Sequence, residues 1–301
     1  MTTAPLVELC EDGPRLSRIV AGAWRMDAWG WTAEQRLAWI EQCVELGVTS
    51  FDHADIYGGY TVEGLFGEAL ALKPGLRDKL QLVSKCGIQL AAPLRPQHAI
   101  KAYDTSRAHI VASVENSLRQ LRTDRLDLLL IHRPDPLMDA DEIAQAFDAL
   151  RRDGKVLHFG VSNFTPAQWD LLASRARLVT NQVECSPLRL DVLHDGTLDQ
   201  AQRVRCRPMI WSPLAGGLLF TGQSDAAQRV RHCLDALALE LGTTPATVVY
   251  AWLLRHPSRP LPIVGSRRVE ALMEAVAAQD LVLSRPQWHR LWSAAAGREV
   301  P

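Results

Sequence analysis

Short apolar runs alternate along the chain with longer segments whose apolar residues recur at helical spacing. The runs predict strands at Ile19–Trp24, Ser50–Ala54, Leu80–Cys86, Leu126–His132, Leu157–Ser162, Thr180–Glu184, Pro208–Ser212 and Leu261–Gly265. The longer segments predict helices at Ala33–Leu46, Thr61–Ala71, Arg107–Leu121, Ala140–Arg152, Pro166–Ala173, Leu198–Arg205, Asp225–Leu241 and Arg267–Ala278. Eight strand–helix units predict an α/β fold, a single (β/α)8 TIM barrel.

Further elements lie outside this repeat. Val7–Leu9 and Leu16–Ser17, on either side of Asp12-Gly13, predict an N-terminal β-hairpin. Two extra helices are expected near Pro245–Arg255 and Pro286–Ala295. No low-complexity linker divides the chain, so residues 1–301 are expected to form one domain. The competing arrangement is an open doubly wound sheet, whose strands are also apolar on both faces.

Local sequence features support the predicted helix ends. Thr165-Pro166 combines an N-cap residue with a proline at the first helical position. Leu46-Gly47 predicts a helix C-terminus, and so does the stretch from Arg152 to Lys155.

Composition excludes several classes of protein. The chain has 301 residues with 33 basic and 34 acidic side chains, a net charge of −1, and no Lys- or Arg-rich run that would indicate a nucleic-acid partner. No apolar run approaches the about 20 residues that span a membrane, and the N-terminal segment lacks the pattern of a secretory signal. We therefore expect a cytoplasmic protein, monomeric, with free cysteines and no metal site. The six cysteines are Cys10, Cys43, Cys86, Cys185, Cys206 and Cys233.

Polar residues stand at the ends of several predicted strands, where a barrel carries its active site. Asp52 belongs to the second strand, Lys85 to the third and His132 to the fourth. Neighbouring strands lie about 4.8 Å apart, so these side chains are expected to converge. Tyr57 lies just beyond the second strand.

Such a set of side chains suits proton donation by a phenol. A free tyrosine, with a pKa of about 10, is a weak acid at neutral pH, and an adjacent ammonium is expected to lower that pKa. Lys85 would supply the ammonium, Asp52 would keep it protonated, and a neutral His132 would hydrogen-bond to the oxygen on which charge develops. Each residue alone also has a structural interpretation, and Asp55 is the alternative carboxylate.

Together these residues resemble the aldo-keto reductase family. Asp52-x-Ala54-x-x-Tyr57 resembles its D-x-A-x-x-Y segment, Leu82-Val83-Ser84-Lys85 its strand-three lysine, and Leu130-Ile131-His132 its strand-four histidine. The resemblance extends from the first strand to about Ala278. It implies reversible, NAD(P)H-dependent reduction of a small-molecule carbonyl substrate.

The resemblance also implies the residues that bind the cofactor. Ser162 and Asn163 would hold the nicotinamide carboxamide, with Gln182 at the matching position of strand six, and Trp211 would stack on the nicotinamide ring. No Gly-x-Gly-x-x-Gly segment follows the first strand, so the dinucleotide would bind without the Rossmann motif. The full set of expected cofactor residues is Gly22, Trp24, Ser162, Asn163, Gln182, Trp211, Ser212, Leu214, Gly265, Ser266, Arg267 and Glu274.

NADP, as NADPH in the reductive direction, is the expected cofactor. Gly265-Ser266-Arg267, with Arg268 as a helper, offers a hydroxyl, guanidinium groups and free N–H groups to a ribose phosphate. The sequence departs from the family at Ala271, where members often have an arginine, and at Glu274-Ala275, where they often have Glu-Asn. These departures weaken the expected preference for NADP over NAD.

Two other functions remain as alternatives. One is a cofactor-binding regulatory or partner-binding subunit, like the channel-associated members of the family, against which the presence of all four catalytic positions argues. The other is a metal-dependent barrel hydrolase, for which the sequence lacks a convincing ligand set.

Only one loop, Gly87–Thr105, is long enough to cover the mouth of the barrel. The sequence therefore predicts an open site with broad substrate selection.

Overall fold

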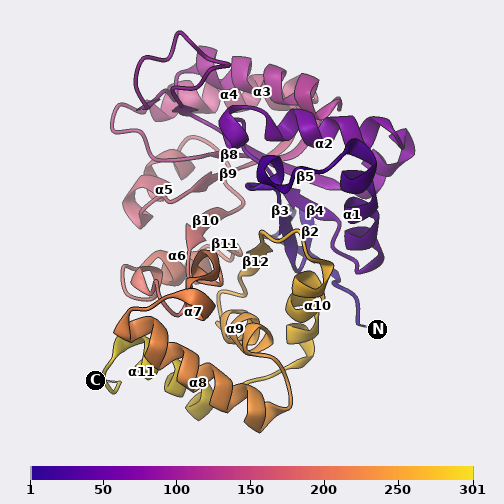
Figure 1. The fold of residues 1–301 in the computed structure, drawn as a ribbon. Coiled ribbons are helices and arrows are strands. Elements are labelled where there is room, and N and C mark those ends of the chain that lie inside the picture. Colours follow the sequence, from indigo (N-terminus) through magenta and orange to yellow (C-terminus); the bar gives the residue numbers. More distant parts are fainter. Residues whose placement is uncertain (1, 301) are drawn as a thin grey trace.

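The computed structural model describes residues 2–300 and shows eight parallel strands closed into a barrel (Figure 1). The barrel strands are β3 (Val20–Gly22), β4 (Ser50–Asp52), β5 (Gln81–Cys86), β8 (Leu126–Ile131), β9 (Val156–Ser162), β10 (Asn181–Glu184), β11 (Met209–Trp211) and β12 (Leu261–Val264). Each strand pairs with the next in chain order, and β12 pairs with β3 to close the sheet. The predicted (β/α)8 barrel is confirmed, and the open doubly wound sheet is wrong.

Helices follow the strands and surround the barrel (Figure 1). They are α1 (Ala33–Glu45), α2 (Val62–Ala71), α3 (Arg107–Leu121), α4 (Ala140–Arg152), α5 (Pro166–Ala173), α6 (Thr197–Arg203), α7 (Leu218–Thr221), α8 (Asp225–Leu241), α9 (Pro245–Leu254), α10 (Val269–Ala277) and α11 (Arg285–Ala296). Short 3-10 turns are η1 (Met26–Trp29), η2 (Tyr57–Gly59), η3 (Pro74–Lys79), η4 (Asp191–Leu193), η5 (Ala215–Gly217) and η6 (Ala278–Asp280).

The helix that packs on the barrel between β11 and β12 is α9, whereas the sequence pattern assigned this place to α8. Helix α9 contacts β12 and α10, while α8 lies outside it and packs against α11 (Figure 1). Nearly every residue of α9 is buried, as expected for a helix that is apolar all round, whereas α8 buries a single stripe. The two extra helices are therefore α8 and α11.

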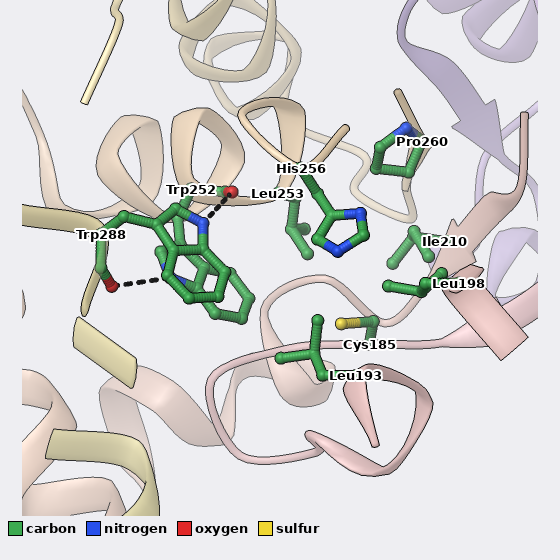
Figure 2. Close-up of a pocket in the computed structure, with 9 residues that line it drawn as sticks. All are labelled: Cys185, Leu193, Leu198, Ile210, Trp252, Leu253, His256, Pro260 and Trp288. Atoms are coloured by element: carbon green, nitrogen blue, oxygen red, sulfur yellow. Dashed lines mark hydrogen bonds between the residues drawn. The ribbon is translucent and has the colours of Figure 1, made fainter. Parts of the chain in front are cut away.

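A pair of tryptophans joins α9 to α11 (Figure 2). The rings of Trp252 and Trp288 stack with their centroids 5.0 Å apart. The Trp252 indole N–H donates to the main-chain oxygen of Trp288 at 3.1 Å, and the Trp288 N–H donates to that of Trp252 at 3.0 Å. The cavity beside them measures about 10 Å³, which leaves room for about one water and no larger ligand.

The predicted N-terminal hairpin is present, formed by β1 (Leu6–Glu8) and β2 (Arg15–Ser17). Leu9 and Leu16 are fully buried and belong to the apolar cluster inside the barrel. The hairpin therefore plugs the barrel at the N-terminal ends of its strands. A second small sheet, β6 (Ile88–Gln89) with β7 (Ala102–Tyr103), lies in the loop after β5 and was not predicted.

Alternation along β5 separates the two cores of the molecule. Val83 belongs to the cluster inside the barrel, whereas Leu82 and Cys86 belong to the larger cluster shared with the helices. Residues two apart on a strand share a face, so Lys85 points inward on the same side as Val83. Lys85 is thus directed from the wall of the barrel toward its axis.

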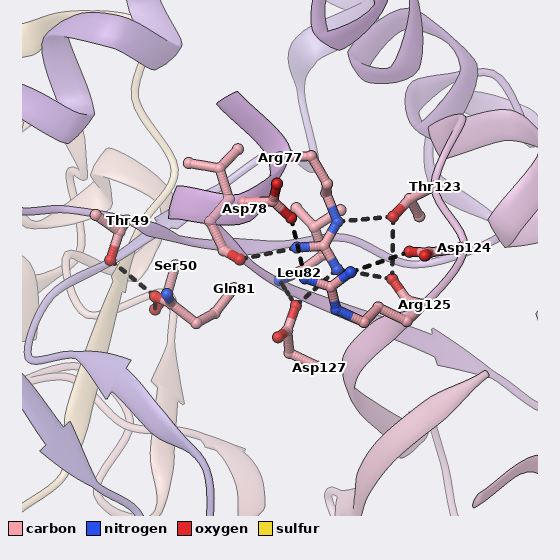
Figure 3. Close-up of polar contacts among 11 residues, drawn as sticks. Thr49, Ser50, Arg77, Asp78, Gln81, Leu82, Thr123, Asp124, Arg125 and Asp127 are labelled. Carbon is pink, nitrogen blue, oxygen red and sulfur yellow. Dashed lines mark hydrogen bonds and ion pairs between the residues drawn. The ribbon is translucent and has the colours of Figure 1, made fainter. Parts of the chain in front are cut away.

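An arginine forms a network of hydrogen bonds at the N-terminal ends of two barrel strands (Figure 3). The buried guanidinium of Arg77 donates to the Thr123 hydroxyl at 2.7 Å, to the main-chain oxygens of Leu80 and Arg125 at 2.9 and 2.8 Å, and to the Asp127 carboxylate at 3.0 Å. Asp127 also accepts from the N–H of Leu82 at 2.8 Å. This network joins the starts of β5 and β8 and lies away from the strand ends that carry the candidate site.

Two predicted helix starts have different outcomes. Thr165 forms a capping box with Gln168, as the Thr165-Pro166 pair predicted. Helix α10 begins at Val269, not at Arg267, so Arg267 and Arg268 precede the helix.

Among residues 2–300 no single helix is long and apolar enough to cross a membrane. Helices α8 and α9 reach that threshold only as a pair, which is bent by 91°.

Candidate active site

The four candidate catalytic residues come from three adjacent barrel strands. Asp52 is the last residue of β4, Lys85 is the penultimate residue of β5, and His132 directly follows β8. Tyr57 begins the turn η2, five residues after Asp52. Parallel pairing of β4 with β5 and of β5 with β8 brings these ends together.

Lys85 is the centre of the group and is 1% exposed. Its Nζ donates to the Asp52 carboxylate at 2.8 and 2.9 Å, to the main-chain oxygen of His53 at 2.8 Å and to the Tyr57 hydroxyl at 3.0 Å. An ammonium has three N–H donors, and here three groups accept from it. The Lys85 ammonium therefore has a fixed direction toward the phenol.

The electrostatics of this group differ from the sequence-based expectation. Burial acts to lower the pKa of Lys85, but the Asp52 carboxylate and Tyr57 outweigh it and raise that pKa, so the ammonium stays charged. Desolvation of the hydroxyl raises the pKa of Tyr57, and Lys85 opposes only part of the rise. The expectation of a lowered Tyr57 pKa is therefore wrong. The phenol keeps its proton at neutral pH, while Lys85 remains placed to stabilise a phenolate.

His132 faces Tyr57 as a neutral imidazole. The ring centroids of His132 and Tyr57 lie 6.0 Å apart, and the His132 Nδ1 is buried without a hydrogen-bond partner among the described residues. Burial, reinforced by the positive charges of Lys85, Arg133 and Lys101, holds the pKa of His132 well below its usual range. Because Nδ1 is buried, the other ring nitrogen, Nε2, is the one available to hydrogen-bond to a substrate oxygen.

Arg133 and Lys101 are functional candidates that the sequence interpretation did not assign. The Arg133 guanidinium lies 5.8 Å from the centroid of the Trp211 ring, and its charge also acts on Tyr57 and His132. Arg133 could have been found from the sequence, because it directly follows His132 at the end of a predicted strand. Lys101 could not, because it lies in the loop after β5 and not at a strand end.

A second set of acidic groups lies buried behind the catalytic set. Glu63 of α2 accepts a hydrogen bond from the Ser84 hydroxyl at 2.6 Å, and burial raises its pKa to about 7. Burial and the nearby Glu63 also raise the pKa of Asp55, whose Oδ1 has no partner among the described residues. Among the described residues, no hydrogen bond or ion pair joins the Asp55 carboxylate to the Lys85 ammonium. The main-chain N–H of Asp55 donates to the Lys85 carbonyl at 3.1 Å. The geometry therefore favours Asp52 as the carboxylate of the site.

The residues expected to hold the nicotinamide form a continuous chain of hydrogen bonds. The Trp211 indole N–H donates to Asn163 Oδ1 at 3.0 Å, and Asn163 Nδ2 donates to the Ser162 hydroxyl at 2.7 Å. Ser162 donates to the Gln182 main-chain oxygen at 2.9 Å, and Gln182 Nε2 donates to Asp52 Oδ1 at 2.7 Å. This chain connects the indole ring to the catalytic carboxylate.

The donor set fits a nicotinamide carboxamide. Asn163 has a positive φ of 61°, a left-handed backbone that asparagine tolerates better than most residues. Its second amide N–H has only a 3.5 Å contact to the His132 oxygen, so it can donate to a ligand. Trp211 presents a partly exposed ring beside it. A flat ring bearing an amide matches these groups.

The remaining expected cofactor residues line the ends of neighbouring strands and the segments that follow them. Gly22 ends β3, where a Cβ would lie 2.9 Å from Ile263 Cγ2, so a side chain at this position would clash. Trp24 is 54% exposed, with its ring 6.5 Å from that of Tyr57. The others are Ser212 and Leu214 after β11, Gly265, Ser266 and Arg267 after β12, and Glu274 on α10.

The segment after β12 leaves two cations free to bind an anion. Arg267 and Arg268 are exposed, and neither guanidinium forms a hydrogen bond or ion pair with another described residue. The Ser266 hydroxyl accepts from the Arg268 N–H at 3.1 Å. No group of three His, Cys, Asp or Glu side chains that could hold a metal occurs within residues 2–300.

Comparison with known proteins identifies the family and several relatives of this chain. The Aldo/keto reductase family matches residues 18–296. The oxidoreductase YdhF of Escherichia coli is 53% identical over 98% of this chain and 99% of its own, and the 6-dehydroglucose reductase of Agrobacterium fabrum is 46% identical over 96% and 97%. The crystal structure of the thermostable aldo-keto reductase Tm1743 with the inhibitor epalrestat has a TM-score of 0.80 at 28% identity, over 96% of this chain and 99% of its own.

The chain therefore belongs to the aldo/keto reductase family, which confirms the resemblance inferred from its sequence motifs. It is an oxidoreductase of that family, whose members bind nicotinamide cofactors and reduce carbonyl groups.

Proposed function

We propose that this protein is an NADPH-dependent reductase that converts aldehydes or ketones to alcohols, with Tyr57 as the proton donor. The observation that carries the proposal is the 3.0 Å hydrogen bond from the Lys85 ammonium to the Tyr57 hydroxyl, with Asp52 on the far side of that ammonium. If Lys85 and Asp52 formed only a structural ion pair, there would be no need for a phenol on the ammonium. Nor would there be a need for the His132 imidazole, whose Nδ1 has no partner among the described residues, beside that phenol.

The residues divide the work of the reaction. When bound against Trp211 and Asn163, NADPH would supply the hydride that the carbonyl carbon accepts. As charge builds on the carbonyl oxygen, the Tyr57 hydroxyl gives it a proton, a step that contributes about 10²–10⁴-fold to the rate when the donor is well placed. Lys85 stabilises the phenolate left behind, Asp52 holds Lys85 charged and in place, and neutral His132 donates a hydrogen bond to the oxygen.

The preference for NADP is supported by the two exposed arginines before α10. A ribose phosphate is a dianion, and a guanidinium holds it by charge-assisted hydrogen bonds. Arg267 and Arg268 lie beside Ser266 and the first N–H groups of the helix, which complete a phosphate-binding segment.

Sugar aldehydes are the first substrates to examine. The Agrobacterium fabrum relative is a 6-dehydroglucose reductase, and glucose oxidised at carbon 6 carries an aldehyde. The segment between His132 and α4 is short, which leaves the mouth of the barrel open on that side. Trp24, Arg133 and Lys101 surround the mouth with an aromatic face and two cations.

The test is the carbonyl-dependent oxidation of NADPH by the wild-type protein and by Tyr57→Phe, with a panel of sugar aldehydes, simple aldehydes and ketones. We expect turnover by the wild type and a loss of about 10²–10⁴-fold in the single-turnover rate of the variant. The dissociation constant for NADPH should stay nearly unchanged. Tyr250→Phe is the matched control, because it removes a phenolic hydroxyl on the buried helix α9, and Tyr250 forms no hydrogen bond with the four candidate catalytic residues.

Two results would contradict the proposal. Retention of turnover by Tyr57→Phe within a factor of a few would remove Tyr57 from the mechanism. Quenching of NADPH fluorescence by the wild type without turnover of any carbonyl would instead favour a cofactor-binding regulatory subunit.

A further inference from the structure

The N-terminal hairpin is attached to the barrel at the starts of its strands. The N–H of Arg207, just before β11, donates to the Leu9 oxygen at 2.7 Å, and the guanidinium of Arg177, which precedes β10, donates to the Glu11 oxygen. These contacts lie at the end of the barrel opposite Tyr57 and Lys85. Chemistry at the hairpin is thus separate from the candidate active site.

Two cysteines meet at this attachment. Cys10 follows Leu9 in the hairpin and Cys206 precedes Arg207, so the main-chain hydrogen bond between Leu9 and Arg207 holds the two cysteines side by side. The two thiols are near enough that each one shifts the pKa of the other. Gly13 leaves the space that the Cys10 thiol occupies, because a Cβ there would lie 2.7 Å from Cys10 Sγ.

The two thiols differ in exposure and in surroundings. Cys10 is partly exposed, whereas Cys206 is buried with its Sγ 3.5 Å from the Val204 oxygen. The neighbouring Cys206 thiol and the adjacent Arg177 lower the pKa of Cys10 to about 7. Desolvation and the charge of Glu8 act in the opposite direction but are outweighed. The neighbouring Cys10 and burial raise the pKa of Cys206. At neutral pH this arrangement favours an accessible thiolate at Cys10 beside a protonated thiol at Cys206.

The other cysteines lack this arrangement. Cys43, Cys86 and Cys185 are buried, and burial raises their pKa values. Cys233 is partly exposed, but burial raises its pKa too. Cys233 has Arg290 beside it, as Cys10 has Arg177, but no neighbouring thiol, so it is a matched control for a partly exposed cysteine outside a pair.

We propose that Cys10 and Cys206 are a peroxide-reactive thiol pair that closes to a disulfide between the hairpin and the barrel. The Cys10 thiolate attacks one oxygen of hydrogen peroxide, the O–O bond breaks, and the leaving hydroxide takes a proton to become water, which leaves a sulfenic acid on Cys10. The Cys206 sulfur, losing its proton, then attacks the Cys10 sulfur and releases a second water. In total, two thiols are oxidised to one disulfide and one peroxide is reduced to two waters.

The experiment treats reduced full-length protein with equimolar hydrogen peroxide under native conditions, then unfolds it and blocks all free thiols with N-ethylmaleimide. Intact mass and peptide mapping follow. We expect the wild type to lose two alkylatable thiols and about 2 Da, and to yield a Cys10–Cys206 cross-linked peptide that dithiothreitol abolishes. The disulfide should raise the thermal unfolding midpoint and leave the turnover of a carbonyl substrate unchanged.

Variants assign the role of each sulfur. Cys206→Ser should stop at a sulfenic acid on Cys10 that dimedone captures. Cys10→Ser should consume peroxide at least about tenfold more slowly than the wild type, and Cys233→Ser should match the wild type. Retention of six alkylatable thiols by the wild type, a cross-link to any other cysteine, or an unchanged rate in Cys10→Ser would overturn the proposal. The wild-type peptide map decides the question even if a variant fails to fold.

Discussion

All three acceptors of the Lys85 ammonium lie within 3.0 Å, which fixes the direction of its charge. That Asp52, Lys85 and Tyr57 would meet was predictable, because strand ends in a parallel barrel share one rim. The direction of the Tyr57 pKa shift was not predictable. It depends on desolvation of the hydroxyl by segments distant in sequence, and this effect exceeds the stabilisation by Lys85.

The Trp211 side chain combines two roles that substitution can separate. Its ring is expected to stack on the nicotinamide, and its N–H positions Asn163. We expect Trp211→Ala to weaken binding of NADP and NADPH roughly two- to tenfold or more, since aromatic stacking contributes about 0.5–1.5 kcal/mol beyond area burial. Trp211→Phe should recover the stacking but not the hydrogen bond to Asn163. Titration of cofactor fluorescence measures both variants, and equal affinities for wild type and Trp211→Ala would show that the nicotinamide binds elsewhere.

At the scale of elements, the sequence located nearly every strand and helix of the barrel, because continuous apolar strands and amphipathic helices have distinct periods. The sequence pattern assigned α8 to the barrel repeat and treated α9 as an extra helix, whereas the structure shows the reverse. Both segments are helical, and only packing shows which of them contacts β12. The sequence pattern also missed β6 and β7, whose two-residue strands are too short to show a period. The sequence pattern predicted the start of α10 at Arg267, two residues before its observed start at Val269.

The start of α10 determines the expected cofactor preference. We predict that the kcat/KM ratio of NADPH to NADH exceeds one in the wild type and falls in Arg267→Ala, with a smaller fall in Arg268→Ala. A charge-assisted hydrogen bond contributes about 1.5–3 kcal/mol, which corresponds to roughly 10- to 150-fold discrimination. The low end is expected, because Ala271 provides no guanidinium at the position where the family resemblance implies a further arginine. A wild-type ratio near one, or a ratio that neither substitution lowers, would contradict the assignment.

At the scale of the whole molecule, buried titratable groups make the stability of the fold depend on pH. Glu63 and Asp55 both have raised pKa values in the folded protein, so deprotonation favours the unfolded chain as the pH rises. Burial lowers the pKa of His53 to about 3, so its protonation opposes folding on the acid side. None of this was visible in the sequence, because it depends on which polar residues the helices cover.

Glu63→Gln should therefore stabilise the protein increasingly between pH 5 and pH 8. A shift of the Glu63 pKa from 4.5 to about 7 corresponds to roughly 3 kcal/mol that the wild type loses over this range. The glutamine still accepts the hydrogen bond from Ser84 and carries no charge. Urea unfolding of wild type and variant at a series of pH values measures the difference. Glu299→Gln, at an exposed position, is the control. If the difference in unfolding free energy between Glu63→Gln and the wild type did not change with pH, Glu63 would not be the source of the pH dependence.

The plug formed by the hairpin also has a kinetic consequence. With Leu9 and Leu16 buried inside the barrel, no molecule can pass along its axis, and every reactant must enter and leave through one opening. The groups expected to hold the nicotinamide continue inward to Gln182, which is 2% exposed, whereas Trp24 at the rim is 54% exposed. A carbonyl compound seated at the rim would thus block the path of the dinucleotide. We therefore expect the dinucleotide to bind first and its oxidised form to leave last, an order that product-inhibition kinetics measures.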